Sequence, residues 1–200
     1  MKIGLIITFI ILVIVSLVVI FYHPIFHFFE KLFFKVKVNK KVYKIAKDYD
    51  FYLLNKVVIK VEGKLIHFDH LLFGNKYIYC IGKNYYSVGI NGRFNDSSWF
   101  QYKGNNKFNI IKNPMRLHRE RVNYFSSKLA SSSDLFVATI IINNSCYLEK
   151  IDGSDKYNVL LNLKNFEKMV IEYEKDKTIN PIEPQRLQDL VLEIHQSNNN

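Results

Sequence analysis

The chain has 200 residues, enough for one soluble domain of ordinary size and a short appendage. Its formal net charge of +10 is uneven, because residues 1–150 carry 22 basic and 9 acidic side chains whereas residues 151–200 carry 6 and 9. A basic body of this kind fits a nucleic acid or an anionic membrane as partner. The two isolated cysteines, Cys80 and Cys146, exclude a disulfide scaffold and a zinc finger, and we expect both to be buried, reduced thiols.

The first predicted element is an apolar helix. Residues 3–22 carry no charge and are long enough to cross a hydrocarbon core of about 30 Å. A cleaved signal peptide is the alternative, but residues 21–29 contain no small-x-small cleavage site. Seven lysines follow between Lys31 and Lys47, so the positive-inside rule predicts a single-pass protein of the cell membrane whose body faces the cytoplasm.

Pro24 is predicted to end this helix, and the aromatic segment after it to lie at the lipid interface or to continue the anchor. These features divide the chain into four parts. They are a transmembrane anchor (1–23), a basic and aromatic juxtamembrane segment (24–39), a folded domain (40–195) and a disordered tail (196–200).

Helical and strand patterns alternate through the folded domain. In chain order they predict a helix (40–54), three strands (57–61, 65–72 and 77–81), a short strand or loop (87–92), a strand (96–102) and a helix (113–129). Three strands (135–142, 147–151 and 158–161) and two helices (163–173 and 184–195) follow. Pro114 suits a first helical position, and the unbroken apolar run 135–142 is typical of a strand covered on both faces. The predicted fold class is α/β, a mixed sheet flanked by helices.

One hairpin in this domain sets an aspartate against a lysine. Asp69 and His70 lie in an apolar strand, and the next strand ends Ile81-Gly-Lys83-Asn-Tyr85. This arrangement resembles the core of the nuclease-related domain (NERD) family, a branch of the PD-(D/E)XK nucleases. The family's second strand ends Glu-x-Lys-Asn-Tyr, so Ile81 stands at the position of the glutamate.

The resemblance continues in the same order along residues 40–195. Its later parts are Gly89-Ile-Asn-Gly92, Trp99, Asn113-Pro114, the strand with its Asn turn (136–144) and the last two predicted helices. It implies a restriction-endonuclease-like core. A membrane anchor ahead of such a domain also occurs in the family.

The resemblance assigns roles to Asp69 and Lys83. In active relatives the aspartate and glutamate hold Mg²⁺, and the lysine polarises the attacking water. Asp69 would then be a metal ligand, and the alternative is a strand-end ion pair with Lys83 worth at most about 1 kcal/mol. Ile81 offers no oxygen, Asn39-Lys40 replaces the family's Gly-Glu, and the expected helix glutamine falls near Leu117. The prediction is a degenerate site without a cofactor, or with Mg²⁺ if activity survives.

A carboxylate from elsewhere in the chain is the alternative to a degenerate site. Glu62, Asp96 and Glu120 are the candidates, and Glu120 lies nearest to the expected glutamine. Its simpler interpretation is an ion pair with arginines of its own helix.

A basic cluster favours binding of nucleic acid through its phosphates. The expected contacts are Arg93, Lys112, Arg116, His118, Arg119 and Arg121, with Lys103 and Lys107. Aromatic residues beside them are candidates for base stacking or, alternatively, for the core: Tyr85, Tyr86, Trp99 and Tyr102. His67 and His70 flank Asp69 but lie three apart on a strand, so they are not expected to form a metal site together.

Three functions follow from these residues. The first is a membrane-anchored, degenerate NERD-like protein that binds nucleic acid or a protein partner. The second is an active, metal-dependent DNA or RNA nuclease with a migrated carboxylate. The third is a membrane-surface interaction module with no role in nucleic-acid binding.

Overall fold

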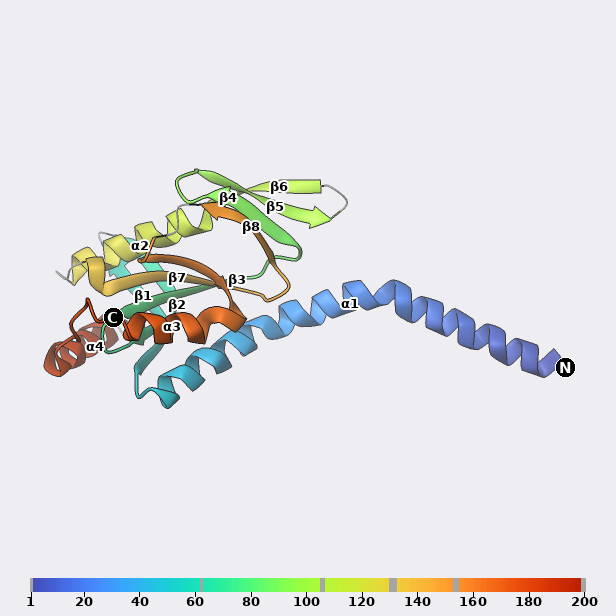
Figure 1. Ribbon diagram of the computed structural model, residues 1–200, viewed down its shortest axis with the longest axis horizontal. Helices are drawn as coiled ribbons and strands as arrows, with labels where there is room; N and C mark the ends of the chain where they lie inside the picture. Colours follow the sequence, from blue (N-terminus) through green and yellow to red (C-terminus); the bar gives the residue numbers. More distant parts are fainter. Residues whose placement is uncertain (1, 62, 105–106, 130–132, 153–154, 199–200) are drawn as a thin grey trace. The chain divides into compact units, whose positions relative to one another are not determined.

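The computed structural model describes residues 2–61, 63–104, 107–129, 133–152 and 155–198 (Figure 1). Two compact units make up the chain, Met1–Lys37 and Val38–Asn200. The elements are α1 (Lys2–Asp48), β1 (Tyr52–Val61), β2 (Lys64–Phe73), β3 (Ile78–Asn84), β4 (Gly89–Arg93), β5 (Ser98–Gly104), β6 (Lys107–Lys112), α2 (Pro114–Lys128), β7 (Phe136–Ile142), β8 (Tyr147–Asp152), β9 (Asn158–Asn162), α3 (Phe166–Glu174) and α4 (Pro184–Asn198). Short 3₁₀ turns precede β7 and α3.

A five-stranded mixed sheet forms the centre of the larger unit. Its strand order is β1-β2-β3-β7-β9, with β1, β2 and β3 antiparallel and β3, β7 and β9 parallel. Every residue of β7 is buried, as its unbroken apolar run predicts. The predicted α/β class is therefore confirmed.

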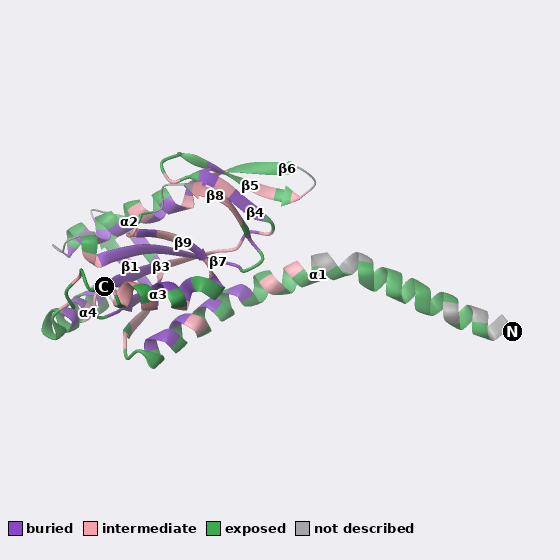
Figure 2. Ribbon diagram, in the orientation of Figure 1, coloured by how far each residue is buried: buried purple, intermediate pink, exposed green. Residues whose placement is uncertain are grey.

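Helices cover both faces of this sheet (Figure 1). On one face, Phe125 of α2 and Leu190 of α4 share an apolar cluster with Phe68 and Cys80 of the strands. On the other face, the Tyr79 hydroxyl lies 3.5 Å from the carbonyl oxygen of Val170 in α3. Alternation along β3 explains the division, since neighbouring residues of a strand face opposite sides. The strands between the helices are largely buried (Figure 2).

The prediction of a single sheet is wrong. A second, four-stranded sheet has the order β6-β5-β4-β8, and β6 was not predicted from the sequence. The sequence of β6, Lys107-Phe-Asn-Ile-Ile-Lys112, alternates over only four residues, and all four of them are exposed, so the strand is not half-buried as alternation would indicate. The buried indole of Trp99 anchors this sheet, and its Nε1 donates to the carbonyl oxygen of Arg93 at 2.7 Å.

The predicted ends of the first two helices, at Pro24 and at Leu54, need correction, because one helix, α1, spans both. α1 continues through Pro24. A proline inside a helix removes one backbone hydrogen bond and can bend the helix, but it does not always end the helix. The helix stops at Asp48, and Asp50 adopts a left-handed φ of 56°. The chain enters β1 at Tyr52, so residues 52–54, predicted to be helical, form strand instead.

The predicted membrane anchor over residues 1–23 finds no support in the structure. Within the described residues, no helix combines the length and the apolar character needed to cross a membrane. At the other end of the chain, α4 extends past its predicted end at His195 to Asn198. The Asn198 side chain accepts a hydrogen bond of 2.6 Å from the backbone N–H of Val58.

We predict that Gly92→Ala destabilises the larger unit by about 1–3 kcal/mol, because an added Cβ would overlap the buried Trp99 ring. Trp99 is the only tryptophan, so its fluorescence during urea unfolding measures the loss directly. Gly4→Ala is the control, since nothing lies within 4 Å of a Cβ at that position. Equal unfolding midpoints for Gly92→Ala and the parent protein would contradict the prediction.

Candidate functional site

Asp69, in the middle of β2, meets Lys83 near the end of β3, just beyond the last pair of the two strands, His70 with Ile81. The Lys83 Nζ lies 3.1 Å from Asp69 Oδ1, and the Lys83 backbone N–H donates to Asp69 Oδ2 at 3.0 Å. The lysine side chain is only 12% exposed and the aspartate side chain 36%. Both oxygens of the carboxylate are therefore bound by one residue, in the ion pair that the sequence suggested as the alternative to metal ligation.

An irregularity in β2 brings Asp69 into this position. Phe68 and Leu71 belong to the same apolar cluster, although residues three apart on a regular strand face opposite sides. The pairing of β1 with β2 also skips Asp69 and Lys56, and Lys56 has a left-handed φ of 53°. The alternation of side chains thus shifts at Asp69, and its carboxylate turns toward β3.

A polar network extends from Lys83 into the protein. Its Nζ also donates to Asn39 Oδ1 of α1 at 3.0 Å, and the same oxygen lies 3.0 Å from His70 Nε2. The other ring nitrogen of His70 lies 2.6 Å from Asn55 Oδ1. Burial, followed by the charge of Lys83, lowers the pKa of His70 to about 4, so the ring is neutral near pH 7. The network holds Lys83 against α1 as well as β2.

A cavity of about 410 Å³ opens beside the Asp69–Lys83 pair. Its charged lining residues are Asp69, Lys83, Lys112 and Arg121, which are one carboxylate and three cations. β2 supplies Asp69 and β3 supplies Lys83, whereas Lys112 ends β6 and Arg121 belongs to α2. Asn113 caps α2 by accepting hydrogen bonds from the backbone N–H groups of Met115 and Arg116, both at 3.0 Å. This cap fixes the start of the helix next to the cavity.

His118 also lines the cavity, but not as the phosphate contact that the sequence predicted. The side chain is buried, and its Nε2 donates to the carbonyl oxygen of Cys80 at 2.8 Å. Burial lowers the pKa of His118 to about 4, which leaves it uncharged near neutral pH. Gly82 permits this close packing, because a Cβ there would stand 3.3 Å from His118 Cε1. His118 therefore helps to form the wall of the cavity but adds no positive charge to it.

The residues of the cavity do not fit the Mg²⁺ ion of active nucleases. Mg²⁺ requires several oxygen ligands in octahedral geometry, whereas both oxygens of Asp69 are held by Lys83. Ile81 is wholly buried and pairs with His70 and Thr139 on the neighbouring strands. Across the described part of the chain, no three His, Cys, Asp or Glu side chains are grouped so as to hold a metal.

Glu120 is not brought to the cavity. It pairs with Arg116 one helical turn earlier, with an Nε to Oε1 distance of 3.2 Å, and both side chains are about half exposed. Asp96 accepts a hydrogen bond from the backbone N–H of Arg93 at 3.1 Å, in the turn after β4. Glu62 lies outside the described residues.

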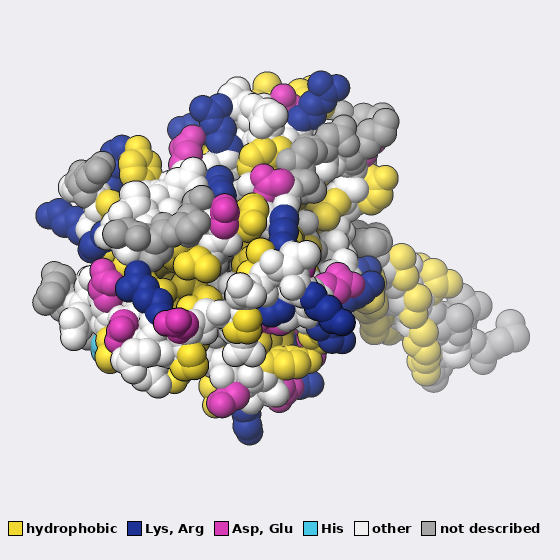
Figure 3. Space-filling view, turned by 60° about the vertical axis from the view of Figure 1, so that its left-hand side comes forward, with side chains coloured by type: hydrophobic (Ala, Val, Ile, Leu, Met, Phe, Trp, Pro, Cys, Tyr) yellow, Lys and Arg dark blue, Asp and Glu magenta, His cyan; other side chains and the backbone are white. Residues whose placement is uncertain are grey.

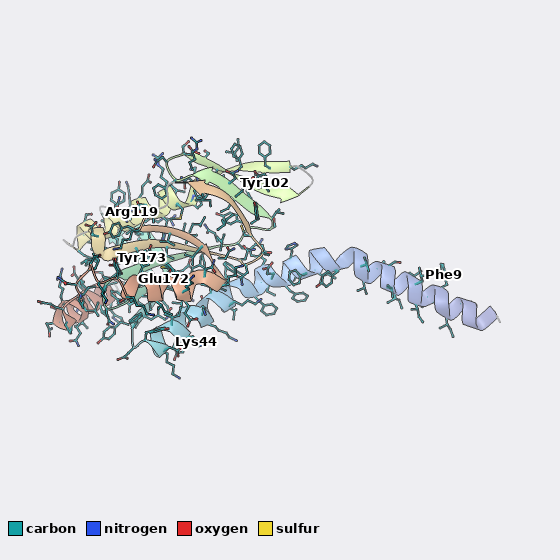
Figure 4. The ribbon with its side chains drawn as sticks, viewed as in Figure 1. Phe9, Lys44, Tyr102, Arg119, Glu172 and Tyr173 are labelled. Carbon is teal, nitrogen blue, oxygen red and sulfur yellow. The ribbon has the colours of Figure 1, made fainter. Side chains whose placement is uncertain are left out.

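The remaining predicted phosphate contacts are dispersed. Arg119 comes from α2 (Figure 4), and its guanidinium lies 3.4 Å from the carbonyl oxygen of Tyr157. Arg93 ends β4, outside the lining of the cavity. The face shown in Figure 3 carries acidic side chains among the lysines and arginines. Of these six predicted contacts, three line the cavity: Lys112, His118 and Arg121. Of the three, Lys112 and Arg121 are exposed cations, whereas His118 is buried.

The four predicted stacking residues have different environments. Trp99 is a core residue, and the Tyr86 ring is also buried, where desolvation raises the pKa of its hydroxyl to about 12. Tyr85 lines the cavity. Tyr102 lies on β5 (Figure 4) and donates to Glu149 Oε2 at 2.9 Å.

Sequence reasoning missed the inner part of the network. In the sequence, Asn39 stands out only as a departure from the family pattern, and His70 only as a strand residue. Their contacts join residues 31 to 44 positions apart, and no local pattern records such a distance. Both cysteines are buried and free, as predicted.

Comparison with known families gives one match. The model of the family described as "NERD: Nuclease-related domain" matches residues 32–143, from α1 to just beyond β7. The matched segment contains Asn39, Asp69, Lys83, Lys112 and Arg121. Neither the search of curated proteins nor that of solved structures found a match.

We predict that acid destabilises the larger unit through its two buried histidines. The pKa values of His70 and His118 are about 4 in the folded state, against about 6.5 in the unfolded chain. Between these values the unfolded chain binds more protons, so stability is complete above pH 6.5 and declines as the pH falls toward 4. One histidine contributes up to about 3 kcal/mol to this decline.

Urea unfolding between pH 7.5 and pH 4.5 measures this effect. His118→Gln keeps a donor for the Cys80 carbonyl oxygen but does not titrate, so its stability should fall less steeply with acid than that of the parent protein. Parallel curves for the two proteins would show that His118 is not responsible.

Proposed function

Because the chain belongs to the nuclease-related domain (NERD) family, we propose that its cavity binds the phosphate backbone of a nucleic acid without hydrolysing it. One observation carries this proposal. Three cations, Lys83, Lys112 and Arg121, line a cavity whose single carboxylate is already paired with Lys83. An excess of positive charge in a concave site attracts phosphates through release of their counterions, without regard to base sequence.

Lys83 has hydrogen-bonding capacity left for such a ligand. An ammonium group has three N–H donors. Two of the three in Lys83 point to Asp69 and Asn39. One donor remains for a phosphate oxygen. Arg121 and Lys112 are exposed, so their side chains are accessible to a ligand at the mouth of the cavity.

Absence of hydrolysis is proposed on the basis of the donor set. Phosphodiester cleavage by a metal ion needs carboxylate oxygens that are free to coordinate it. Both oxygens of Asp69 already accept hydrogen bonds from Lys83, no second carboxylate stands among the described lining residues, and Glu120 is paired with Arg116. A nuclease with a migrated carboxylate is accordingly the outcome that the following experiment is designed to detect.

We predict that Arg121→Ala and Lys112→Ala each lower the salt dependence of nucleic-acid binding. Each removes one phosphate contact, so the slope of log K against log salt should fall by about 0.9, with roughly eightfold weaker binding at 0.1 M salt. Fluorescence anisotropy with labelled DNA and RNA measures both quantities. Lys168→Ala is the matched control, because that lysine is 79% exposed and lies on α3, outside the cavity.

The same samples are incubated with Mg²⁺ and with Mn²⁺ and examined for cleavage. We expect intact nucleic acid throughout. Cleavage that Asp69→Asn abolishes would replace the proposal with an active nuclease. Absence of binding to either nucleic acid would remove the proposed function altogether.

We also propose that the N-terminal part of α1 attaches the protein to a membrane, with the larger unit in the cytoplasm. Large apolar side chains along residues 6–33 are exposed, including Phe9 at 67% (Figure 4) and Leu12 at 62%. Burial of such side chains in lipid is favourable by about 25 cal/mol per Å². Lysines after this segment favour anionic head groups on the cytoplasmic side.

We predict that the double variant Leu12→Glu/Val19→Glu moves the protein from the membrane fraction to the soluble fraction of fractionated cells. Charged side chains in an apolar segment oppose its transfer into lipid by about 2.5–3.5 kcal/mol each. Tyr43→Glu is the control, since Tyr43 is 62% exposed but lies outside this segment. Parent protein in the soluble fraction, or washed from membranes by carbonate as readily as the double variant, would contradict membrane attachment.

A further inference from the structure

The outer face of the four-stranded sheet carries exposed aromatic rings. Its inner face contributes Trp99, Ile90, Ile111 and Leu148 to an apolar cluster. Neighbouring residues on a strand point to opposite sides, so the residues between them form the outer face. Aromatic side chains project from the β5–β6 hairpin into solvent (Figure 4), and every residue of β6 except Ile111 is exposed (Figure 2).

Strand register arranges these outer side chains in two rows. One row crosses the sheet as Phe108, Tyr102, Gly89 and Tyr147, and the other as Ile110, Phe100, Asn91 and Glu149. Residues directly opposite each other on paired strands share a face. Phe100, Phe108 and Tyr147 are 44%, 57% and 65% exposed. Gly89 has no side chain to separate Tyr102 from Tyr147, and a Cβ there would stand 3.3 Å from Tyr147 Cβ.

Basic residues stand at both ends of the hairpin. Lys103 and Lys107 lie at its turn, whereas Lys112 and Arg93 lie at the opposite end, where Lys112 pairs with Ser98. Residues 89–112 carry four basic side chains and one acidic side chain. On β8, Glu149 adds a carboxylate to the face, and it accepts hydrogen bonds from Asn91 at 3.2 Å and Tyr102 at 2.9 Å.

This charge distribution distinguishes between two partners for the face, a second copy of the chain and a polyanion that carries flat apolar groups. A second copy pairing antiparallel along the edge strand β6 would bring Lys107 close to Lys112 of the other copy. Like charges on opposed strands are destabilising, and lysines on edge strands discourage such pairing. A polyanion with flat apolar groups is instead complementary to rings flanked by cations.

We propose that the outer face of the β6-β5-β4-β8 sheet binds single-stranded nucleic acid, whose unpaired bases stack on Phe108, Phe100 and Tyr147. This inference rests on the proposed function and specifies its ligand as single-stranded. The sheet adjoins the cavity, which supports this inference, because Ile111 and Lys112 at the end of β6 line the cavity. A strand whose phosphates lie at the cavity can extend its bases across the sheet.

The test compares variants that keep or remove a ring. Phe108→Leu and Tyr147→Leu retain apolar area without a ring, whereas Phe108→Tyr retains the ring. Tyr43→Leu is the matched control, an exposed ring on α1 away from this face. Binding of the full chain to labelled oligothymidylate and to a labelled blunt duplex is measured by anisotropy over a series of salt concentrations.

We expect each Leu variant to bind the single strand on the order of tenfold more weakly, with the salt slope and duplex affinity unchanged. Phe108→Tyr and Tyr43→Leu should remain within about twofold of the parent protein. The salt slope separates this result from loss of a cavity cation, which changes the slope.

Three results would overturn the inference. If the Leu variants bind like the parent while Arg121→Ala still weakens binding, the face is not a nucleic-acid surface and the proposed function stands. If the parent protein binds no nucleic acid, both this inference and the proposed function are wrong. If sedimentation detects a parent dimer that Phe108→Glu dissociates, the face joins two copies of the chain.

Discussion

The parallel pairing of β3 with β7 determines where the charged residues of the cavity lie. Seven consecutive pairs join the two strands, from Ile78 with Phe136 to Asn84 with Ile142. Two parallel strands need a long crossover between them, and here the crossover includes β4, β5, β6 and α2. Lys83 lies near the carboxyl end of β3, where open α/β sheets place their ligands. The crossover returns past the same end, so Lys112 and Arg121 arrive beside Lys83.

The Asp69–Lys83 pair bears both on the proposed phosphate binding and on the fit of a metal ion. A lysine side chain that is only 12% exposed needs a partner, because burial of an unpaired charge is costly. Asp69 meets that need with Oδ1, while its Oδ2 accepts the Lys83 backbone N–H, and Asn39 adds a neutral acceptor for the ammonium group. Asp69 is the one carboxylate among the described lining residues, so the cavity lacks the several oxygen ligands that a hard cation requires. A phosphate needs only the remaining donor of Lys83, so phosphate binding is compatible with the pair.

Sequence patterns predicted the parts of the fold that depend on local chemistry. Asn113-Pro114 marks a helix start because the Asn side chain caps the first backbone N–H groups and proline needs no donor. The unbroken apolar run of β7 predicts burial on both sides. The two-sheet arrangement was not predictable in this way, since strand periodicity does not say which strands pair. The irregularity at Asp69 and the burial of His118 also depend on distant partners, and His118 was therefore mistaken for a cation.

Strand β6 borders both the cavity and the outer face of the four-stranded sheet. Ile111 faces the cavity and the core, whereas Phe108 and Ile110 face outward. The polar and apolar residues of β6 alternate over only four positions, which is too short a run to distinguish a strand from the loop that precedes α2. Exposed apolar side chains on an edge strand also carry a risk of aggregation, which flanking lysines reduce. Lys107 and Lys112 stand at the two ends of β6, so the residues that protect the edge are also those that would hold a polyanion against it.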